Sequence, residues 1–178
     1  MKPLKAFTIP FGGLKQGEHH YTFDVERPFF EYFEYDDIND ANITVALKLL
    51  KKATLLEFYF DIKGKVNVHC DLTNEPFDLK IETTGKLIVN FGSEYNNENE
   101  ELLILPHGSY EINIQQYVYE FIVLSIPAKK VHPGVVDGSL DSDMLKKLEE
   151  YSIDITREEQ KNNTDPRWDS LKKLLTDK

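Results

Sequence analysis

INIQQYVYEFIVLSIPAKKVHPG, residues 112–134, is the one long stretch of the chain with a clean helical apolar repeat. Apolar residues recur at intervals of three and four and therefore share one helical face: Ile114, Tyr117, Val118, Phe121 and Ile122. Asn113 can cap the first turn, and Pro127 ends the run. About thirteen residues span roughly 20 Å, too little for a hydrocarbon core of about 30 Å. We predict a core helix over 114–126, covered by a sheet on more than one side.

Alternating apolar and polar residues predict several strands before the helical stretch. The alternating runs are 5–9, 21–25, 44–50, 56–62, 66–70, 77–81 and 87–91. Turns are predicted at Gly12-Gly13, at Lys63-Gly64 and at Gly85, and a loop over 93–101. Short connections favour antiparallel pairing. The predicted fold class is α+β: a twisted antiparallel β-sheet, or a partly open barrel, packed on a central helix, with a C-terminal linker and a short docking helix.

The chain divides by composition into three predicted parts. Residues 1–138 form the α+β domain, residues 139–163 a weak helix and polar linker, and residues 164–178 the C-terminal docking helix. This last helix is predicted from TDPRWDSLKKLL, with Asp165 as its N-cap and Pro166 at the first helical position. Because about ten residues do not hold a helix alone in water, it must dock on its own domain or on a partner.

Composition excludes several classes of protein. The 178 residues carry a net charge of -10, which disfavours nonspecific binding to nucleic acid and predicts no DNA partner. One cysteine rules out an internal disulfide framework and fits a reducing compartment. We see no secretion signal and no membrane-length apolar window. The prediction is a cytoplasmic protein with no membrane partner.

Charge is unevenly distributed along the chain. Residues 18–40 hold eight acids against Arg27 alone: Glu18, Asp24, Glu26, Glu31, Glu34, Asp36, Asp37 and Asp40. This run is either a solvated face or a dock for a basic protein. The basic side chains either form a local phosphate-contacting patch or are scattered for solvation. They are Lys129, Lys130 and His132, together with Lys2, Lys5 and Lys15 of the basic N-terminal segment and Lys48, Lys51, Lys52, Lys63 and Lys65.

The sequence predicts no catalytic residue, no metal ligand and no cofactor. It has no glycine-rich phosphate loop and no protease, hydrolase or kinase motif. His69 and Cys70 are neighbours on a predicted strand and so point to opposite faces, which prevents a shared metal ion. Asp71 and Glu75 are expected to raise the pKa of the Cys70 thiol. Cys70 is therefore predicted to be a small buried apolar side chain.

Three segments in order resemble the large ribosomal RNA subunit accumulation family, the YceD-like domain. VNVHCDLTNEPF at 66–77 is similar to the family's strand, C-x-x-C-x-x-P-F turn and next strand. Residues 114–127 with His132 resemble its proline-terminated helix and following histidine, and DPRWDSLKKL at 165–174 resembles its C-terminal ending. Thr73 stands where many members have a second cysteine, so a thiolate metal site or redox pair is not implied here.

The resemblance implies a noncatalytic role in accumulation of 23S rRNA and assembly of the large ribosomal subunit. Its expected partner is the large-subunit precursor, through 23S rRNA, a basic ribosomal protein or both. The candidate partner-binding residues are Asp165, Pro166, Arg167, Trp168 and Leu171, with Lys129, Lys130 and His132. The alternative is an acidic binding module or chaperone for a basic ribosomal protein such as L32, without direct RNA contact.

Overall fold

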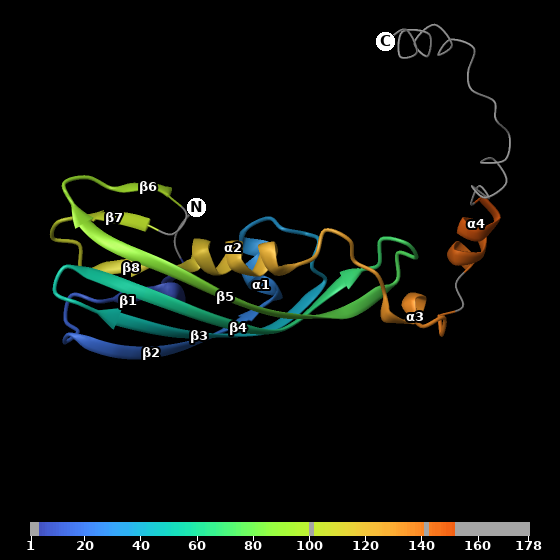
Figure 1. Cartoon of the computed structure of the whole chain (residues 1–178), viewed down its shortest axis with the longest axis horizontal. Helices are drawn as coiled ribbons and strands as arrows, with labels where there is room; N and C mark the ends of the chain where they lie inside the picture. The colour runs from blue at the N-terminus through green and yellow to red at the C-terminus, as the bar shows by residue number, and fades with distance from the viewer. Residues whose placement is uncertain (1–3, 100–101, 141–142, 152–178) are drawn as a thin grey trace, which may run out of the picture. The chain divides into compact units, whose positions relative to one another are not determined.

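A computed structural model describes residues 4–99, 102–140 and 143–151 (Figure 1). The chain forms two units, residues 1–140 and residues 141–178. The elements of the first unit are η1 (Lys5–Phe7), β1 (Thr8–Pro10), β2 (Gly17–Glu26), α1 (Arg27–Tyr32), β3 (Asp40–Lys51), β4 (Leu55–His69), β5 (Pro76–Gly92), β6 (Asn96–Asn99), β7 (Leu102–Pro106), β8 (Glu111–Asn113), α2 (Gln115–Ser125) and α3 (Pro133–Val136). The described part of the second unit is α4 (Asp143–Tyr151).

Six strands form one open sheet in the order β2-β3-β4-β5-β7-β6. The α+β class and the mostly antiparallel sheet are confirmed, and the sheet is open because its end strands β2 and β6 do not pair. One pair departs from the prediction: β7 runs parallel to β5, with Ile88 opposite Leu102. Part of the predicted loop over 93–101 is strand β6, antiparallel to β7. β6 is the end strand of the sheet, and β7 lies between β6 and β5. The chain therefore forms β6 first and then runs along β5 in the same direction as β5.

Two glycines predicted as turns lie instead inside the two longest strands. β4 continues through Gly64 for 15 residues, and β5 continues through Gly85 for 17 residues. A Cβ on Gly64 would lie 2.3 Å from the carbonyl oxygen of Asn42 in β3. A Cβ on Gly85 would lie 2.4 Å from the ring of Phe121 in α2. Both glycines permit close approach of a neighbouring element, which is the second common meaning of glycine in a strand.

Helix α2 is the predicted core helix; three of the five residues of its predicted apolar face are buried, while Tyr117 and Phe121 are half-buried. Ile114, Val118 and Ile122 are fully buried. The helix begins at Gln115, whose backbone N–H donates to Asn113 Oδ1 at 3.0 Å. Figure 1 shows α1 and α2 on the same face of the sheet.

The expectation that α2 is covered on more than one side holds for part of the helix. Tyr119 stacks on Phe33, just after α1, with ring centroids 4.2 Å apart. Leu124, one turn further along, is 82% exposed. Cover by α1 therefore ends before the last turn of α2.

The N-terminal segment pairs with the residues just before α2. Residues 5–9 are not one strand: Lys5–Phe7 is a 3-10 turn, and β1 pairs antiparallel with β8, with Thr8 opposite Asn113. Asn113 Nδ2 donates to the carbonyl of Leu4 at 3.0 Å, and Ile114 N donates to the carbonyl of Phe7 at 3.0 Å. Residues more than a hundred positions apart thus close one face of the core.

Tyr117 on α2 carries a testable pH effect. Burial, then the neighbouring Tyr95 and Glu120, raise the pKa of Tyr117 to about 12. An unfolded tyrosine ionises near pH 10, so the native state keeps this proton longer. The resulting stability is present below about pH 10 and is lost as pH rises toward 12.

We therefore expect Tyr117→Phe to flatten the decline in the free energy of unfolding between about pH 10 and 12. Urea unfolding at several alkaline pH values and titration of phenolate absorbance measure this. Tyr110→Phe is the matched control, because Tyr110 is 65% exposed. A Tyr117→Phe titration that loses an early-ionising tyrosine instead of the last one would contradict the assignment.

The second unit contains the predicted weak helix before the linker. It is α4, and Met144, Leu148 and Tyr151 recur along it at helical spacing. Their exposed fractions are 49%, 47% and 79%. The rest of the predicted linker and the C-terminal docking helix lie outside the described residues.

Candidate functional site

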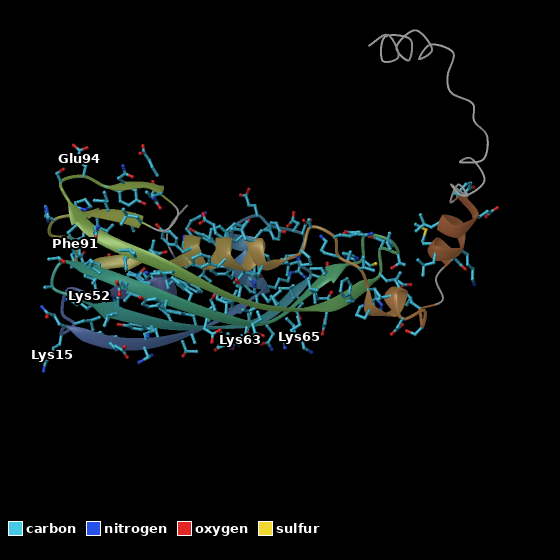
Figure 2. The ribbon with its side chains drawn as sticks, viewed as in Figure 1. Lys15, Lys52, Lys63, Lys65, Phe91 and Glu94 are labelled. Atoms are coloured by element: carbon cyan, nitrogen blue, oxygen red, sulfur yellow. The ribbon has the colours of Figure 1, made fainter. Side chains whose placement is uncertain are left out.

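The outer face of the sheet, turned away from α2, gathers lysines from three adjacent strands. We call it the lysine face; its members are Lys48 of β3, Lys63 and Lys65 of β4, and Lys80 and Lys86 of β5. Pairing across the strands aligns His20, Lys48, Tyr59 and Lys86 in one row. Figure 2 shows Lys63 and Lys65 along this side of the sheet.

Acidic neighbours compensate much of the lysine face. Lys48 lies 3.8 Å from Glu18, and Lys65 lies 3.8 Å from Asp78. Lys63 lies 3.0 Å from Asp61 and 3.4 Å from Glu82, and these hydrogen bonds raise its pKa. Exposed pairs of this kind add little stability, but they cancel local charge. The face therefore offers less net attraction for phosphate than its lysine count implies.

Two lysines predicted for a phosphate patch have other positions. Lys51 Nζ donates to the carbonyls of Phe11 and Leu14, both at 2.8 Å, so it ties a loop to the end of β3. Lys52 pairs with Glu57 at 2.8 Å, beyond β3. Figure 2 places Lys52 at the end of the sheet that carries Lys15.

Three members of the row and the face were not found from the sequence. Lys80 and Lys86 belong to β5, whose two halves were predicted as separate strands. Tyr59 lies between Lys48 and Lys86, whose ammonium groups are 5.1 Å and 5.6 Å from its ring centroid. The alternation of polar and apolar residues marked all three as outward-facing. Only the strand register places them in one row.

The predicted acidic run forms an exposed margin on β2, α1 and the connection to β3. We call it the acidic margin; its members are Glu18, Asp24, Glu26, Glu31, Glu34, Asp36, Asp37 and Asp40, all exposed. Among the described residues, only Glu18 and Glu31 have a lysine or arginine nitrogen within 4.0 Å, from Lys48 and from Arg27. Six of the eight acids thus keep uncompensated charge.

The pKa of Tyr35 is affected by an acid of this margin. Burial raises the pKa of the Tyr35 phenol, and the neighbouring carboxylate of Asp37 raises it further. Tyr35 also meets Tyr119 edge to face, with ring centroids 6.0 Å apart. The aromatic layer between α1 and α2 therefore borders the acids directly.

The predicted site residues after α2 are fixed to the hairpin that joins β4 and β5. Lys130 N donates to Asp71 Oδ2 at 2.6 Å, and Asp71 N donates to the carbonyl of Lys130 at 2.8 Å. The ring of His132 packs edge to face on Phe77 at 5.4 Å, and its Nδ1 accepts from Gly134 N at 2.9 Å. His132 therefore has a structural role in this position, while Lys129 is exposed.

The sequence Pro133-Gly134 with Gly138 is typical of an exposed connector, and this expectation holds for Pro133 and Gly138 but is wrong for Gly134. Pro133 opens α3, and Gly134 is buried. A Cβ on Gly134 would lie 3.0 Å from both Leu140 Cβ and His132 Nδ1, so the turn closes tightly over the glycine.

Cys70 is buried, as predicted, at the start of the turn from β4 to β5. Its sulfur accepts a hydrogen bond from His132 N at 3.3 Å. Burial raises the pKa of the thiol, but hydrogen bonds from the Thr73 hydroxyl and from the N–H groups of His132, Leu72 and Thr73 outweigh it, and the pKa lies below its usual value. The expected rise from nearby acids is wrong, because backbone donors converge on the sulfur. Thr73, where the resemblance has cysteine, is one of these donors.

The remaining predicted site residues lie outside the described part of the chain. They are Asp165, Pro166, Arg167, Trp168 and Leu171. Among the residues that are described, no group of three or more His, Cys, Asp or Glu side chains is placed to hold a metal ion. No helix in that part of the chain is long and apolar enough to cross a membrane.

The described residues form an α+β protein with a mostly antiparallel open sheet and an exposed acidic margin. Residues 58–175 match the family described as large ribosomal RNA subunit accumulation protein YceD, and the chain belongs to that family. Membership implies a role in accumulation of the RNA of the large ribosomal subunit. Comparison with curated proteins and with solved structures gives no match.

Proposed function

We propose that this protein is a noncatalytic factor that supports 23S rRNA accumulation and large-subunit assembly by binding a basic protein of the large-subunit precursor. The observation that carries the proposal is the acidic margin, six of whose eight exposed acids have no cationic partner among the described residues. Uncompensated charge attracts a partner of opposite sign and steers its approach. A basic ribosomal protein such as L32 has the required chemistry.

Direct RNA binding through the lysine face is the weaker alternative. Phosphate contacts gain their free energy from cations that are free to replace counterions. Lys48, Lys63 and Lys65 already lie within 4.0 Å of carboxylates. The segment of Lys129 and Lys130 and the C-terminal residues around Trp168 remain candidates for a second contact with the precursor.

Sedimentation tests the role in the cell. A tagged full-length chain is expected to comigrate with large-subunit precursors, and its depletion is expected to lower 23S rRNA relative to 16S rRNA. A protein that never comigrates with these particles, together with unchanged 23S rRNA on depletion, would remove the proposal.

A binding experiment tests the surface. Neutralising Glu34 and Asp36, two acids of the margin without a cationic partner among the described residues, to glutamine and asparagine is expected to weaken binding to a basic ribosomal protein roughly fivefold to tenfold at low salt, and less at high salt. The matched control neutralises Glu94 and Glu98, exposed acids near β6 at the opposite edge of the sheet. Equal losses in both variants would show a nonspecific charge effect and would contradict this surface.

A further inference from the structure

β2 is an edge strand, and no described strand pairs with its outer side. It has ten residues, and β3 pairs with it from Gly17 to Glu26 on one side only. Within the described residues, no backbone hydrogen bond joins β2 to a segment outside the sheet. Its outward N–H and C=O groups therefore form a template on which an extended chain can pair.

The side chains of β2 favour a paired chain of positive charge. Three acids, Glu18, Asp24 and Glu26, project on its outer face and are exposed. Like charges placed opposite each other repel, so these acids disfavour pairing of β2 with a second acidic copy. A basic strand meets the opposite condition, because its cations come to lie across from the carboxylates.

The other face of β2 is aromatic. Tyr21 and Phe23 are half-buried, and their ring centroids are 6.4 Å apart. Phe23 also stacks on Phe7 of η1 at 5.2 Å. A paired strand would place every second residue beside these rings, so apolar residues fit there.

A small pocket lies at the Glu26 end of the strand. Its volume is about 280 Å³, and its lining includes the apolar residues Leu4, Phe7, Pro28 and Phe29 together with the acidic residues Asp24 and Glu26. Lysine and arginine pack their aliphatic stems on apolar surface and keep the cation at a polar rim. The pocket thus has the chemistry of a site for one basic side chain. Lys5 of the chain also borders it.

We propose that the free edge of β2 binds an extended basic segment of a protein partner by strand addition. Cations of that segment lie opposite Glu18, Asp24 and Glu26, apolar residues lie on Tyr21 and Phe23, and one basic side chain enters the pocket. This inference rests on the proposed function for the nature of the partner and adds the mode of binding. It predicts a recognised motif in which basic and apolar residues alternate.

The test uses the full-length chain and a synthetic fluorescent peptide as long as β2, with lysine and valine alternating. Fluorescence anisotropy at low salt measures its dissociation constant. A second peptide has the same composition with all lysines preceding all valines. Since both peptides carry equal charge, the alternating one is expected to bind at least about tenfold more tightly. Equal affinity, or no binding of either peptide, would overturn strand addition.

N-methylation of the peptide tests the backbone pairing without changing the protein. One form carries N-methyl groups on its lysines and the other on its valines. Only alternate N–H groups of an added strand face β2, so one form should lose affinity by at least about tenfold while the other keeps it. Equal behaviour of the two forms contradicts pairing at an edge.

Charge variants locate the peptide on β2. Asp24→Asn with Glu26→Gln should weaken the alternating peptide about fivefold to tenfold, while Glu94→Gln leaves it unchanged. Both changes are on exposed side chains, and thermal unfolding verifies that the fold is kept. If the peptide binds and these variants have no effect, the site lies elsewhere on the molecule.

The peptide-binding experiments and the depletion experiment can fail independently of each other. Alternation-dependent binding with unchanged 23S rRNA on depletion would leave the edge site in place and remove the proposed function. Reduced 23S rRNA with no peptide binding would keep the function and remove strand addition.

Discussion

Phe30→Ala is expected to lower the free energy of unfolding by about 3–5 kcal/mol, the range for removing a fully buried aromatic side chain. Phe30 has no exposed surface, and its ring meets Phe29 edge to face at 5.5 Å. Its carbonyl accepts hydrogen bonds from the N–H groups of Phe33 and Tyr35, at 3.0 Å and 3.1 Å. The substitution therefore leaves a cavity where α1 turns toward β3. Urea denaturation followed by circular dichroism measures the loss.

Leu124→Ala is the control for this prediction. Leu124 is a large apolar residue of α2 that is 82% exposed, so its truncation should change stability by no more than about 0.5 kcal/mol. The Phe30 cavity should also loosen the acidic margin, because Glu31 and Glu34 flank the same turn. A loss below about 1 kcal/mol for Phe30→Ala would contradict the packing described for α1.

Gly64→Val is expected to cost at least about 3 kcal/mol or to prevent folding, at the upper end of overpacking effects. A Cβ at this position would lie 2.3 Å from the Asn42 carbonyl oxygen and 2.6 Å from the Ile43 Cα. Both atoms belong to the backbone of β3, so no side-chain rotation relieves the overlap. β3 and β4 would have to separate at the centre of the sheet. Soluble yield and urea denaturation measure the effect.

Substitutions at two other glycines serve as comparisons for Gly64→Val. A Cβ on Gly85 meets the ring of Phe121, a side chain that can move, so Gly85→Ala should cost about 1–2 kcal/mol. Gly13 has nothing within 4 Å of the added atom, so Gly13→Ala should be nearly neutral. A Gly64→Val protein as stable as Gly13→Ala would exclude the close approach of β3 and β4.

The central helix was predictable because its signal is local. The spacing of Ile114, Val118 and Ile122 defines a face whatever lies against it, and the bounds were correct to within one residue. At Pro28 the sequence left a short helix and an aromatic loop equally open, and the structure has the helix α1 there. A helix whose pattern depends only on neighbours in sequence can therefore be predicted from the sequence.

The strands were harder because glycine has more than one structural meaning. Gly64 and Gly85 look like turn residues in sequence, but each makes room for an element distant along the chain. The parallel position of β7 depends on the β6 hairpin, whose sequence around Asn96 is polar and fully exposed. The local sequence pattern predicts neither the glycines inside strands nor the parallel position of β7, because both arise from tertiary packing.

For the candidate site, residue type was predictable and charge balance was not. The acidic run was identified in full, and its members are exposed as a solvated margin requires. The pairing of Lys63 and Lys65 with acids depends on strand register. The turn predicted at Gly64 divides β4 into two strands and so gives the wrong register. The pocket beside Glu26 joins η1, β2 and α1, segments that no motif connects.

The pairing of β1 with β8 sets the order in which a newly made chain can complete its fold. β3, β4 and β5 pair through short connections, so this part of the sheet can form while synthesis continues. Thr8 has to wait for Asn113, which emerges more than a hundred residues later. Until then Ile9, which is buried in the finished protein and pairs with Ile112, lacks this cover, whereas Phe7 can already pack on Phe23 and Phe29. A segment made well before β8 is thus among the last to be secured, and the nascent chain depends longest on protection there.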